Sequence, residues 1–326
     1  MLRMLNGVGP TRKPNFWWIH VFLAFVCLAA NPLAAETPKM EGHQAGNEST
    51  LFIPFSPPLN TELRFRLTKE TIGGEKEKKT ELDCILVFAQ KGDGYLMTVE
   101  YRVPVNPKAK IKGAQTAAVI GPVVFRLNEV AEIAEVLDED EYWESTLALI
   151  KLARPKDHAY AERAILDMRR KPDADRFDLI AANILPIINL AYTEHVPGKV
   201  DSETYQTKAV VGDRDVTSSS TSKLTVVSDR LAKYEVRTVT SGGQIKAAVT
   251  GAVESVGDTQ GDKEKSRKSI EKIGKMSFDD LVGTETYQVS FDTGLAEKFE
   301  SRQVVVVSDE TEKATVTKIV RLQKIE

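Results

Sequence analysis

The chain has 326 residues, of which 44 are Lys or Arg and 47 are Asp or Glu, so its formal net charge is −3. This balance lacks the basic excess that attracts a nucleic acid or an anionic membrane surface, and we expect neither as a partner. The length is sufficient for one large core or two modest ones. Cys84 is the only cysteine after residue 35, so no internal disulfide is expected in an exported chain.

Residues 1–35 have the pattern of a secretory signal peptide. Three basic residues and no acidic one precede the apolar run FWWIHVFLAFVCLAA (16–30), and NPLAA then ends in small residues. A membrane-spanning helix usually needs roughly 18 or more apolar residues, so no permanent membrane anchor is expected. We predict cleavage between Ala35 and Glu36 and export to the periplasm, with the extracellular space as the alternative. Residues 36–50 are polar and predict a disordered tail.

A short phrase recurs in the second half of the chain. SETYQ at 202–206 returns as TETYQ at 284–288, and VVSD follows each copy, at 226–229 and at 306–309. Around both copies, apolar and polar residues alternate between turns rich in Gly, Asp and Ser, which is the signal of antiparallel strands joined by tight connections. Each copy therefore predicts a three-stranded meander.

A third and more diverged meander opens the exported domain at ELRFRLTKE (62–70). We therefore predict a mainly β (α+β) fold, with a broad antiparallel sheet or half-barrel built from repeated three-stranded meanders. Tyr205 and Tyr287, the tyrosines of the repeated phrase, could form a paired binding site, but we expect each to pack against a neighbouring strand. Cys84 lies in the alternating segment LDCILVF (82–88), where a small buried residue is expected rather than a reactive thiol.

The periodicity becomes helical between residues 138 and 192. Asp138 has the position of a helix N-cap, with Glu141 three residues later. A second helix is expected over 157–170 and a third helical stretch over 173–192. Pro186 lies inside the third stretch, where it must kink the helix or start a new one, because proline has no backbone N–H to donate.

The third stretch carries the widest apolar stripe after residue 35. Phe177, Ile180, Ile184 and Ile188 recur at helical spacing. One interpretation is a helix that closes the apolar face of the sheet as ordinary core. The other is a lid over an apolar cavity, since a curved sheet with movable helices can contain a lipid-like ligand. These four residues are our candidate face for an apolar ligand.

The remaining organisation is simpler. The segment VGDTQGDKEKSRKSIEK (256–272) is predicted to be a charged, solvated loop between the last two meanders. Residues 51–326 then form a single β-rich domain with a helical insert at about 138–192. A subdivision into 51–137 and 198–326 is the alternative.

The sequence predicts no catalytic, cofactor-binding or metal-binding residue. His43, His158 and His195 do not have the spacing of a zinc helix, and a lone cysteine cannot form a thiolate cluster. Acidic residues DEDE (138–141) are favoured at a helix start by the helix dipole, although calcium binding through Asp138 and Asp140 is a second interpretation.

A signal peptide followed by meanders of a broad sheet with a helical insert is similar in arrangement to periplasmic lipid carriers of the unclosed half-barrel type. The leading hypothesis is an exported, non-enzymatic protein of the cell envelope that binds an apolar, lipid-like ligand or an envelope partner. A purely structural or interaction protein of the periplasm is the alternative, and a hydrolase with a carboxylate site is the third.

Overall fold

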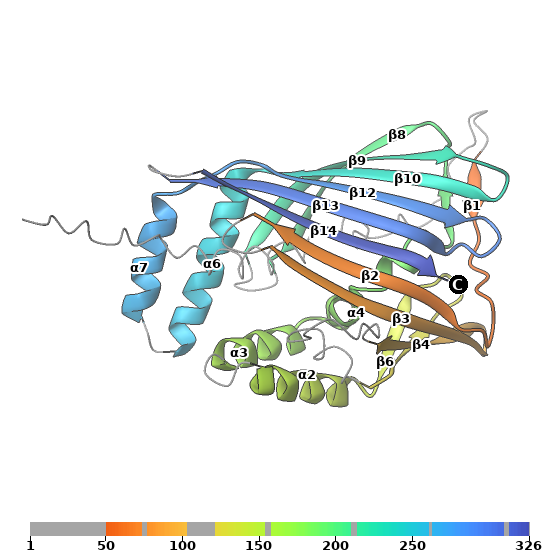
Figure 1. Ribbon diagram of the computed structural model, residues 1–326, viewed down its shortest axis with the longest axis horizontal. Helices are drawn as coiled ribbons and strands as arrows, with labels where there is room; N and C mark the ends of the chain where they lie inside the picture. The colour runs from red at the N-terminus through yellow and green to blue at the C-terminus, as the bar shows by residue number, and fades with distance from the viewer. Residues whose placement is uncertain are drawn as a thin grey trace, which may run out of the picture.

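The computed structural model describes residues 50–73, 77–102, 121–153, 158–209, 214–260, 263–309 and 313–325. The expected signal peptide and all but the last residue of the expected tail lie outside these ranges. The largest part of the described fold is one antiparallel sheet of twelve strands, in the order β6-β5-β4-β3-β2-β14-β13-β12-β10-β9-β8, with β11 paired to β13 beside this path. Strands β6 and β8 are its two edges, so the sheet is not closed (Figure 1). The predicted mainly β fold with an unclosed antiparallel sheet is confirmed.

The longest strand of this sheet is β3, with 14 residues. The bounds of the strands are β2 Leu63–Ile72, β3 Lys78–Lys91, β4 Gly94–Arg102, β5 Val123–Leu127, β6 Ile133–Leu137, β8 Val200–Lys208, β9 Asp215–Val226, β10 Leu231–Thr240, β11 Ser277–Phe278, β12 Leu281–Ser290, β13 Ala296–Ser308 and β14 Lys313–Ile325. A separate two-stranded ribbon pairs β1 (Leu51–Ile53) with β7 (Thr193–His195). At about 3.3 Å per residue, β3 spans roughly 45 Å, so the sheet has a long inner face.

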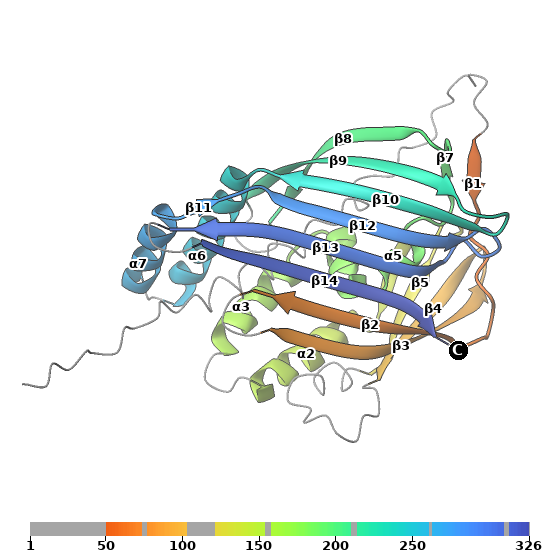
Figure 2. The same ribbon diagram turned by 45° about the horizontal axis from the view of Figure 1, so that its top comes forward.

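The three predicted meanders are present as β2-β3-β4, β8-β9-β10 and β12-β13-β14. The repeated phrase lies in β8 and β12, the first strand of its meander, and VVSD lies where β9 and β13 end. Pairing of β10 with β12 and of β14 with β2 sets the meanders side by side (Figure 2). The β14–β2 pairing also joins the end of the chain to its first long strand.

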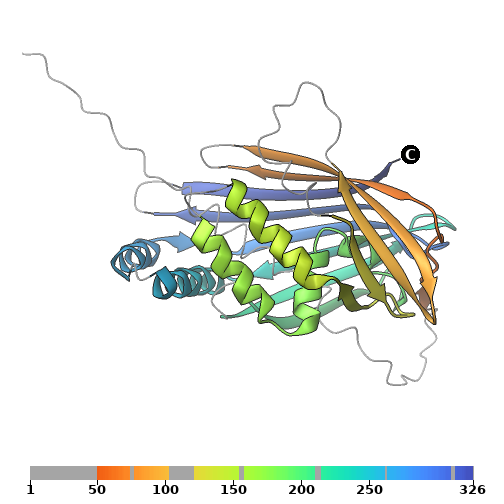
Figure 3. The same cartoon turned by 90° about the horizontal axis from the view of Figure 1, so that it is seen from below.

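The helices lie on one side of the sheet and at one end of it. Their bounds are α2 Glu139–Ala153, α3 His158–Arg169, α4 Asp173–Ala181, α5 Leu185–Ile188, α6 Gly242–Gln260 and α7 Lys263–Gly274. Seen from below, α2 and α3 lie across the sheet while α6 and α7 lie at its end (Figure 3). The predicted helical insert is confirmed, and the stretch 173–192 divides into α4 and α5.

The charged loop predicted for 256–272 is wrong. Its described residues belong to α6 and α7, which pack against each other and against the end of the sheet. Ile245, Val249 and Val253 are buried at four-residue spacing on α6, and Ile273 of α7 joins them. The apolar stripe of α7 is narrow, so its many charges dominate the composition although the helix is amphipathic.

The two faces of the sheet differ in chemistry. On the outer face, Arg321 of β14 donates to Glu300 of β13 at 2.9 Å and to Glu70 of β2 at 3.1 Å, and Lys79 of β3 lies 3.7 Å from Glu70. On the inner face, register pairing sets one apolar row across six strands: Leu224, Tyr234, Tyr287, Phe299, Leu322 and Leu67. The outer side is therefore charged, while the inner side carries the core.

Cys84 is completely buried in β3, as the alternation predicts. Burial raises the pKa of its thiol to about 12, so the thiol is protonated and inert at neutral pH. We expect Cys84→Ala to lower the free energy of unfolding by about 1 kcal/mol, since a small core truncation leaves only a small void. Denaturant unfolding measures this, and a variant with unchanged stability but lost binding would show instead that the thiol has a functional role.

Candidate functional site

The inner face carries two apolar clusters. The main cluster joins inner residues of most strands with residues of helices α2 to α5, and the second cluster joins α6 and α7 to the other end of the sheet. Between them runs a polar belt, which we define by two neighbouring cross-strand rows: Ser222, Glu285, Ser301 and Lys69 in one, Ser220, Thr238, Gln303 and Lys318 in the other. Among the described residues, six of the eight buried polar ones lie on the inner face: Ser218, Ser220, Thr238, Thr240, Glu285 and Ser301.

Helices α4 and α5 cover the main cluster. Helix α4 begins after Pro172, with Asp173 and Asp175 in its first turn, where the helix dipole favours acidic residues. The chain leaves the helix over 182–184 and Pro186 lies in the first turn of α5. Proline is tolerated at this place because the first-turn N–H groups have no partner within the helix. Pro186 therefore starts a new helix, one of the two outcomes that the sequence predicts.

The four candidate ligand-face residues all lie in the main cluster. Phe177 is 7% exposed, Ile180 5%, Ile184 0% and Ile188 2%. Helix α4 packs against β6, and α5 packs against β13 near the middle of the sheet. The apolar sides of both helices therefore face the sheet, and the helical cover connects one edge of the sheet with its centre.

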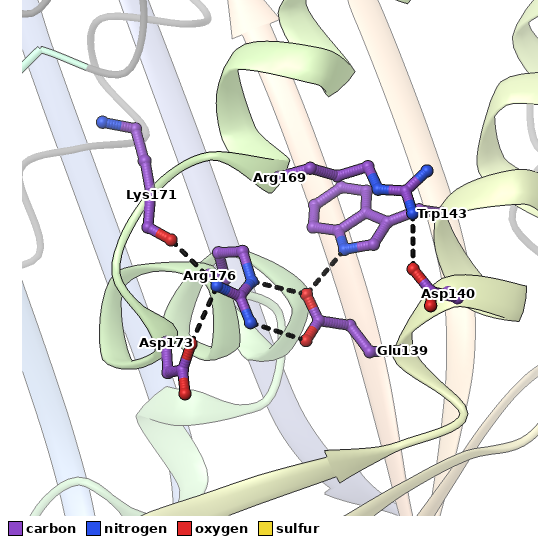
Figure 4. A network of polar contacts seen from close by, with 7 residues as sticks. All are labelled: Glu139, Asp140, Trp143, Arg169, Lys171, Asp173 and Arg176. Carbon is purple, nitrogen blue, oxygen red and sulfur yellow. Dashed lines mark hydrogen bonds and ion pairs between the residues drawn. The ribbon is translucent and has the colours of Figure 1, made fainter.

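An ion-pair network fixes α4 to the start of α2 (Figure 4). The guanidinium of Arg176 donates to both carboxylate oxygens of Glu139, at 2.7 and 3.0 Å, and to the backbone carbonyl of Lys171 at 2.9 Å. Trp143 donates its indole N–H to Glu139 at 2.8 Å. A guanidinium nitrogen of Arg176 also lies 2.9 Å from a carboxylate oxygen of Asp173. The guanidinium lowers the pKa of Glu139, and its bidentate geometry makes this a strong contact.

The acidic run 138–141 lines an open pocket of about 680 Å³ together with Arg169 and Arg176. Asp140 accepts a hydrogen bond from Arg169, so Glu139 and Asp140 both have arginine partners. Asp138 has a φ of 58°, a left-handed conformation that differs from the extended one of an N-cap residue. Across the residues that the structure describes, no group of three His, Cys, Asp or Glu side chains is placed to hold a metal ion.

The polar belt holds two ionisable groups in unusual surroundings. The ammonium of Lys69 donates to Oδ1 of Asn183 at 2.5 Å, and burial lowers its pKa to about 8. Glu285 is 7% exposed and accepts a hydrogen bond from the Tyr287 hydroxyl at 2.7 Å. Burial raises the pKa of Glu285 to about 7. Both side chains are ionisable groups on the face that otherwise carries the core.

The aromatic residues of the repeated phrase pack as strand residues. Tyr287 is completely buried, with ring centroids 4.8 Å from Phe299 and 6.1 Å from Tyr234. Tyr205 is buried on β8, opposite Ser218 of β9. The two tyrosines lie in different rows of the sheet, so they form no pair. The expectation that each tyrosine packs against a neighbouring strand is confirmed for Tyr287, whose ring contacts lie on β10 and β13.

His195 lies in β7 and packs against Tyr234, with ring centroids 5.0 Å apart. Burial lowers its pKa, so the ring is neutral at pH 7. His43 lies outside the described residues, as does the side chain of His158. No described arrangement therefore makes His195 part of a catalytic set.

Sequence reasoning missed Lys69, Asn183 and Glu285. A signal was present for two of them. In LRFRLTKE the inner positions are Leu63, Phe65 and Leu67, so the next inner position is Lys69. In TETYQV, Glu285 lies two residues before Tyr287 and therefore on the same inner face of β12. A charged residue at an inner position of an alternating strand is the pattern that indicates a polar site.

Comparison with known proteins gives no family. No family model and no curated protein matches the chain. A solved structure of lipovitellin, described as "Lipid-protein interactions in lipovitellin", is 9% identical with a TM-score of 0.37 over 81% of this chain, which spans a quarter of the lipovitellin chain. An outer membrane channel from Pseudomonas putida F1 is 7% identical with a TM-score of 0.15, over 87% of this chain and all of the channel. Both TM-scores are too low to support an argument about function.

None of the helices in the described ranges is both long and apolar enough to cross a membrane. The described chain thus forms a broad unclosed sheet, and helices α2 to α5 cover its apolar inner face.

Proposed function

We propose that the protein is an exported, non-enzymatic binding protein of the cell envelope, which holds an apolar, lipid-like ligand between the inner face of its sheet and helices α4 and α5. One observation carries the proposal. The sheet does not close, and the main cluster is completed by a helical cover that breaks at residues 182–184. A cover made of short segments can move away from the sheet without breaking any strand pairing.

Packing supports this arrangement. Short α5, with only four residues, contributes Leu185, Ile187 and Ile188 to the main cluster. A helix of one turn is not stable by itself, so α5 keeps its conformation through contacts with the sheet. An apolar ligand that replaces those contacts would compensate for their loss, because it buries the same type of surface.

Ile184→Trp tests the proposal. If the ligand shares the space under α4 and α5, tryptophan fills that space at modest loss of stability and excludes the ligand. Lipid extracted from the host should then raise the thermal midpoint of the wild type by mass action and leave the variant unchanged. Ile245→Trp is the matched control, since Ile245 is equally buried but lies in the second cluster. This control should keep the response to lipid.

The alternative is a structural or interaction protein with a fully packed interior. The low exposure of Ile184 and Ile188 favours this alternative, because side chains in a fully packed core are buried in the same way. Overpacking a dense core typically costs about 1–3 kcal/mol. If neither the wild type nor Ile245→Trp responds to any lipid, and Ile184→Trp loses its cooperative transition, the binding function is excluded and the structural alternative stands.

A further inference from the structure

The polar belt contains a cationic site next to the main cluster. Lys69 is the first inner residue of β2 beyond the apolar positions Leu63, Phe65 and Leu67. Its cross-strand neighbours on the inner face are Thr80 of β3 and Val320 of β14, neither of which is charged. The ammonium therefore lies where the apolar lining ends and the polar belt begins.

The second lysine of the site is Lys318. It lies two residues before Val320 on β14 and pairs with Thr71 of β2, so it is a diagonal inner-face neighbour of Lys69. Diagonal neighbours of this type are within reach of long side chains, with backbones roughly 7–8 Å apart. Two like charges therefore face the same part of the belt, and their repulsion adds to the effect of burial in lowering the pKa of Lys69.

No described carboxylate neutralises Lys69. Its hydrogen-bond partner is the neutral side chain of Asn183, and Lys69 forms no ion pair with any acid in the described ranges. Glu285 lies in the same cross-strand row but three strands away, roughly 14 Å at about 4.8 Å per strand. Buried charges are normally paired, so a half-buried lysine with only an amide partner indicates a missing anion.

Asn183 connects this site with the helical cover. It lies in the break between α4 and α5, directly before Ile184. Its side-chain oxygen accepts the hydrogen bond from Lys69. The cationic site and the apolar candidate face are thus adjacent, with one residue between them.

We propose that Lys69 and Lys318 bind the oxyanion head group of an amphiphile, a carboxylate or a phosphate, whose apolar tail lies in the main cluster under α4 and α5. The inference rests on the proposed function for the tail, while the head-group contact rests on the two lysines. On binding, the anion replaces Asn183 as the partner of the Lys69 ammonium, and a charge-assisted contact of this kind is stronger than one with a neutral amide.

Calorimetric titration of the full chain with five probes tests the site: dodecanoate, dodecyl phosphate, dodecan-1-ol, and the tail-free anions acetate and inorganic phosphate. We expect the wild type to bind at least one of the two charged amphiphiles about tenfold or more tightly than dodecan-1-ol, which has the same tail and no charge. The charged probe that binds best identifies the head group. The tail-free anions should bind far more weakly.

Two variants locate the contact. Lys69→Met and Lys318→Met should each reduce the preference for the charged probe about tenfold while dodecan-1-ol binding is unchanged. Lys79→Met is the control, since this lysine lies on the outer face of the neighbouring strand β3. Thermal melting checks that each variant is folded. Because the two lysines lie on different strands, either variant alone can test the site if the other does not fold.

The outcomes separate the two proposals. Equal binding of charged and uncharged probes by the wild type would overturn the head-group site and leave the apolar-ligand function standing. If the tail-free anions bind as tightly as the charged amphiphiles, the apolar tail contributes nothing, and the proposal that the ligand is an amphiphile is overturned. An unchanged preference of folded Lys69→Met for the charged probe over dodecan-1-ol would contradict the role of Lys69.

Discussion

Replacing Arg176 with methionine is expected to lower the free energy of unfolding by about 2 kcal/mol at pH 7. The guanidinium bonds to Glu139 through two hydrogen bonds, and both side chains are about one fifth exposed. Breaking a buried pair typically costs about 3–5 kcal/mol because one charge remains unpaired, and partial exposure reduces this cost. Denaturant unfolding of wild type and variant measures the difference.

The pH dependence of this difference follows from Glu139. Arg176 lowers the pKa of this carboxyl below its ordinary value of 4.5. A lowered carboxyl pKa stabilises the fold above pH 4.5, and the contribution is lost as pH falls through the lower, folded-state value. The wild type and Arg176→Met should therefore approach each other in acid. A difference that stays constant to pH 3 would show that packing, rather than the ion pair, causes the loss.

Arg321→Met is the matched control for Arg176→Met. Arg321 also bonds to two acids, Glu300 and Glu70, but it is 40% exposed on the outer face. Exposed ion pairs contribute about 0–1 kcal/mol. If α4 is part of the cover over a ligand, Arg176→Met should also speed ligand release, whereas Arg321→Met should leave the release rate unchanged.

The strands were predictable because their side chains alternate over long stretches. Tyr287, Val289 and the turn at Gly294, which has a φ of 73°, show a period of two followed by a residue that tolerates left-handed backbone. The order of the strands was not predictable. The β14–β2 pairing joins residues 251 positions apart, as Glu70 and Arg321 are, and no local pattern records such a contact.

The missed helices show where composition misleads. The polar composition of 256–272 predicts a loop, yet its described residues belong to α6 and α7, and the next residue, Ile273, is completely buried against α6. The preceding residues IKAAVTGAV (245–253) do carry a helical apolar pattern, and they would have predicted α6. The narrow apolar stripe of α7 is recognisable only together with the surface against which it packs. That surface includes the end of a sheet built from distant strands.

The candidate site was predictable in part. The apolar stripe of Phe177, Ile180, Ile184 and Ile188 is visible in the sequence, and all four residues are buried in the main cluster. The hydrogen bond between Lys69 and Asn183 joins residues 114 positions apart, so no local pattern predicts it. It forms because the segment between α4 and α5 packs over β2. The network of Arg176 and Glu139 likewise joins two helices whose mutual position only the folded chain defines.

Glu285→Gln is expected to raise the free energy of unfolding by about 2 kcal/mol at pH 8. Glu285 is buried in the polar belt, and burial raises the pKa of its carboxyl to about 7 from an ordinary value of 4.5. One pKa unit corresponds to about 1.4 kcal/mol, so ionisation of the buried group costs about 3 kcal/mol above pH 7. Glutamine removes that cost and keeps an acceptor for the Tyr287 hydroxyl.

The sign of the pH dependence identifies this carboxyl. Between pH 4.5 and 7 the folded protein retains a proton on Glu285 that the unfolded chain has lost, so stability falls as pH rises through this window. Denaturant unfolding at pH 5 and pH 8 should show this fall in the wild type and a smaller one in Glu285→Gln. Glu300→Gln, on the outer face of the neighbouring strand, should retain the wild-type fall. If Glu285→Gln loses stability at pH 8 and keeps the full fall between pH 5 and pH 8, then Glu285 is ionised at little cost, and a cation near it in the polar belt must neutralise the charge.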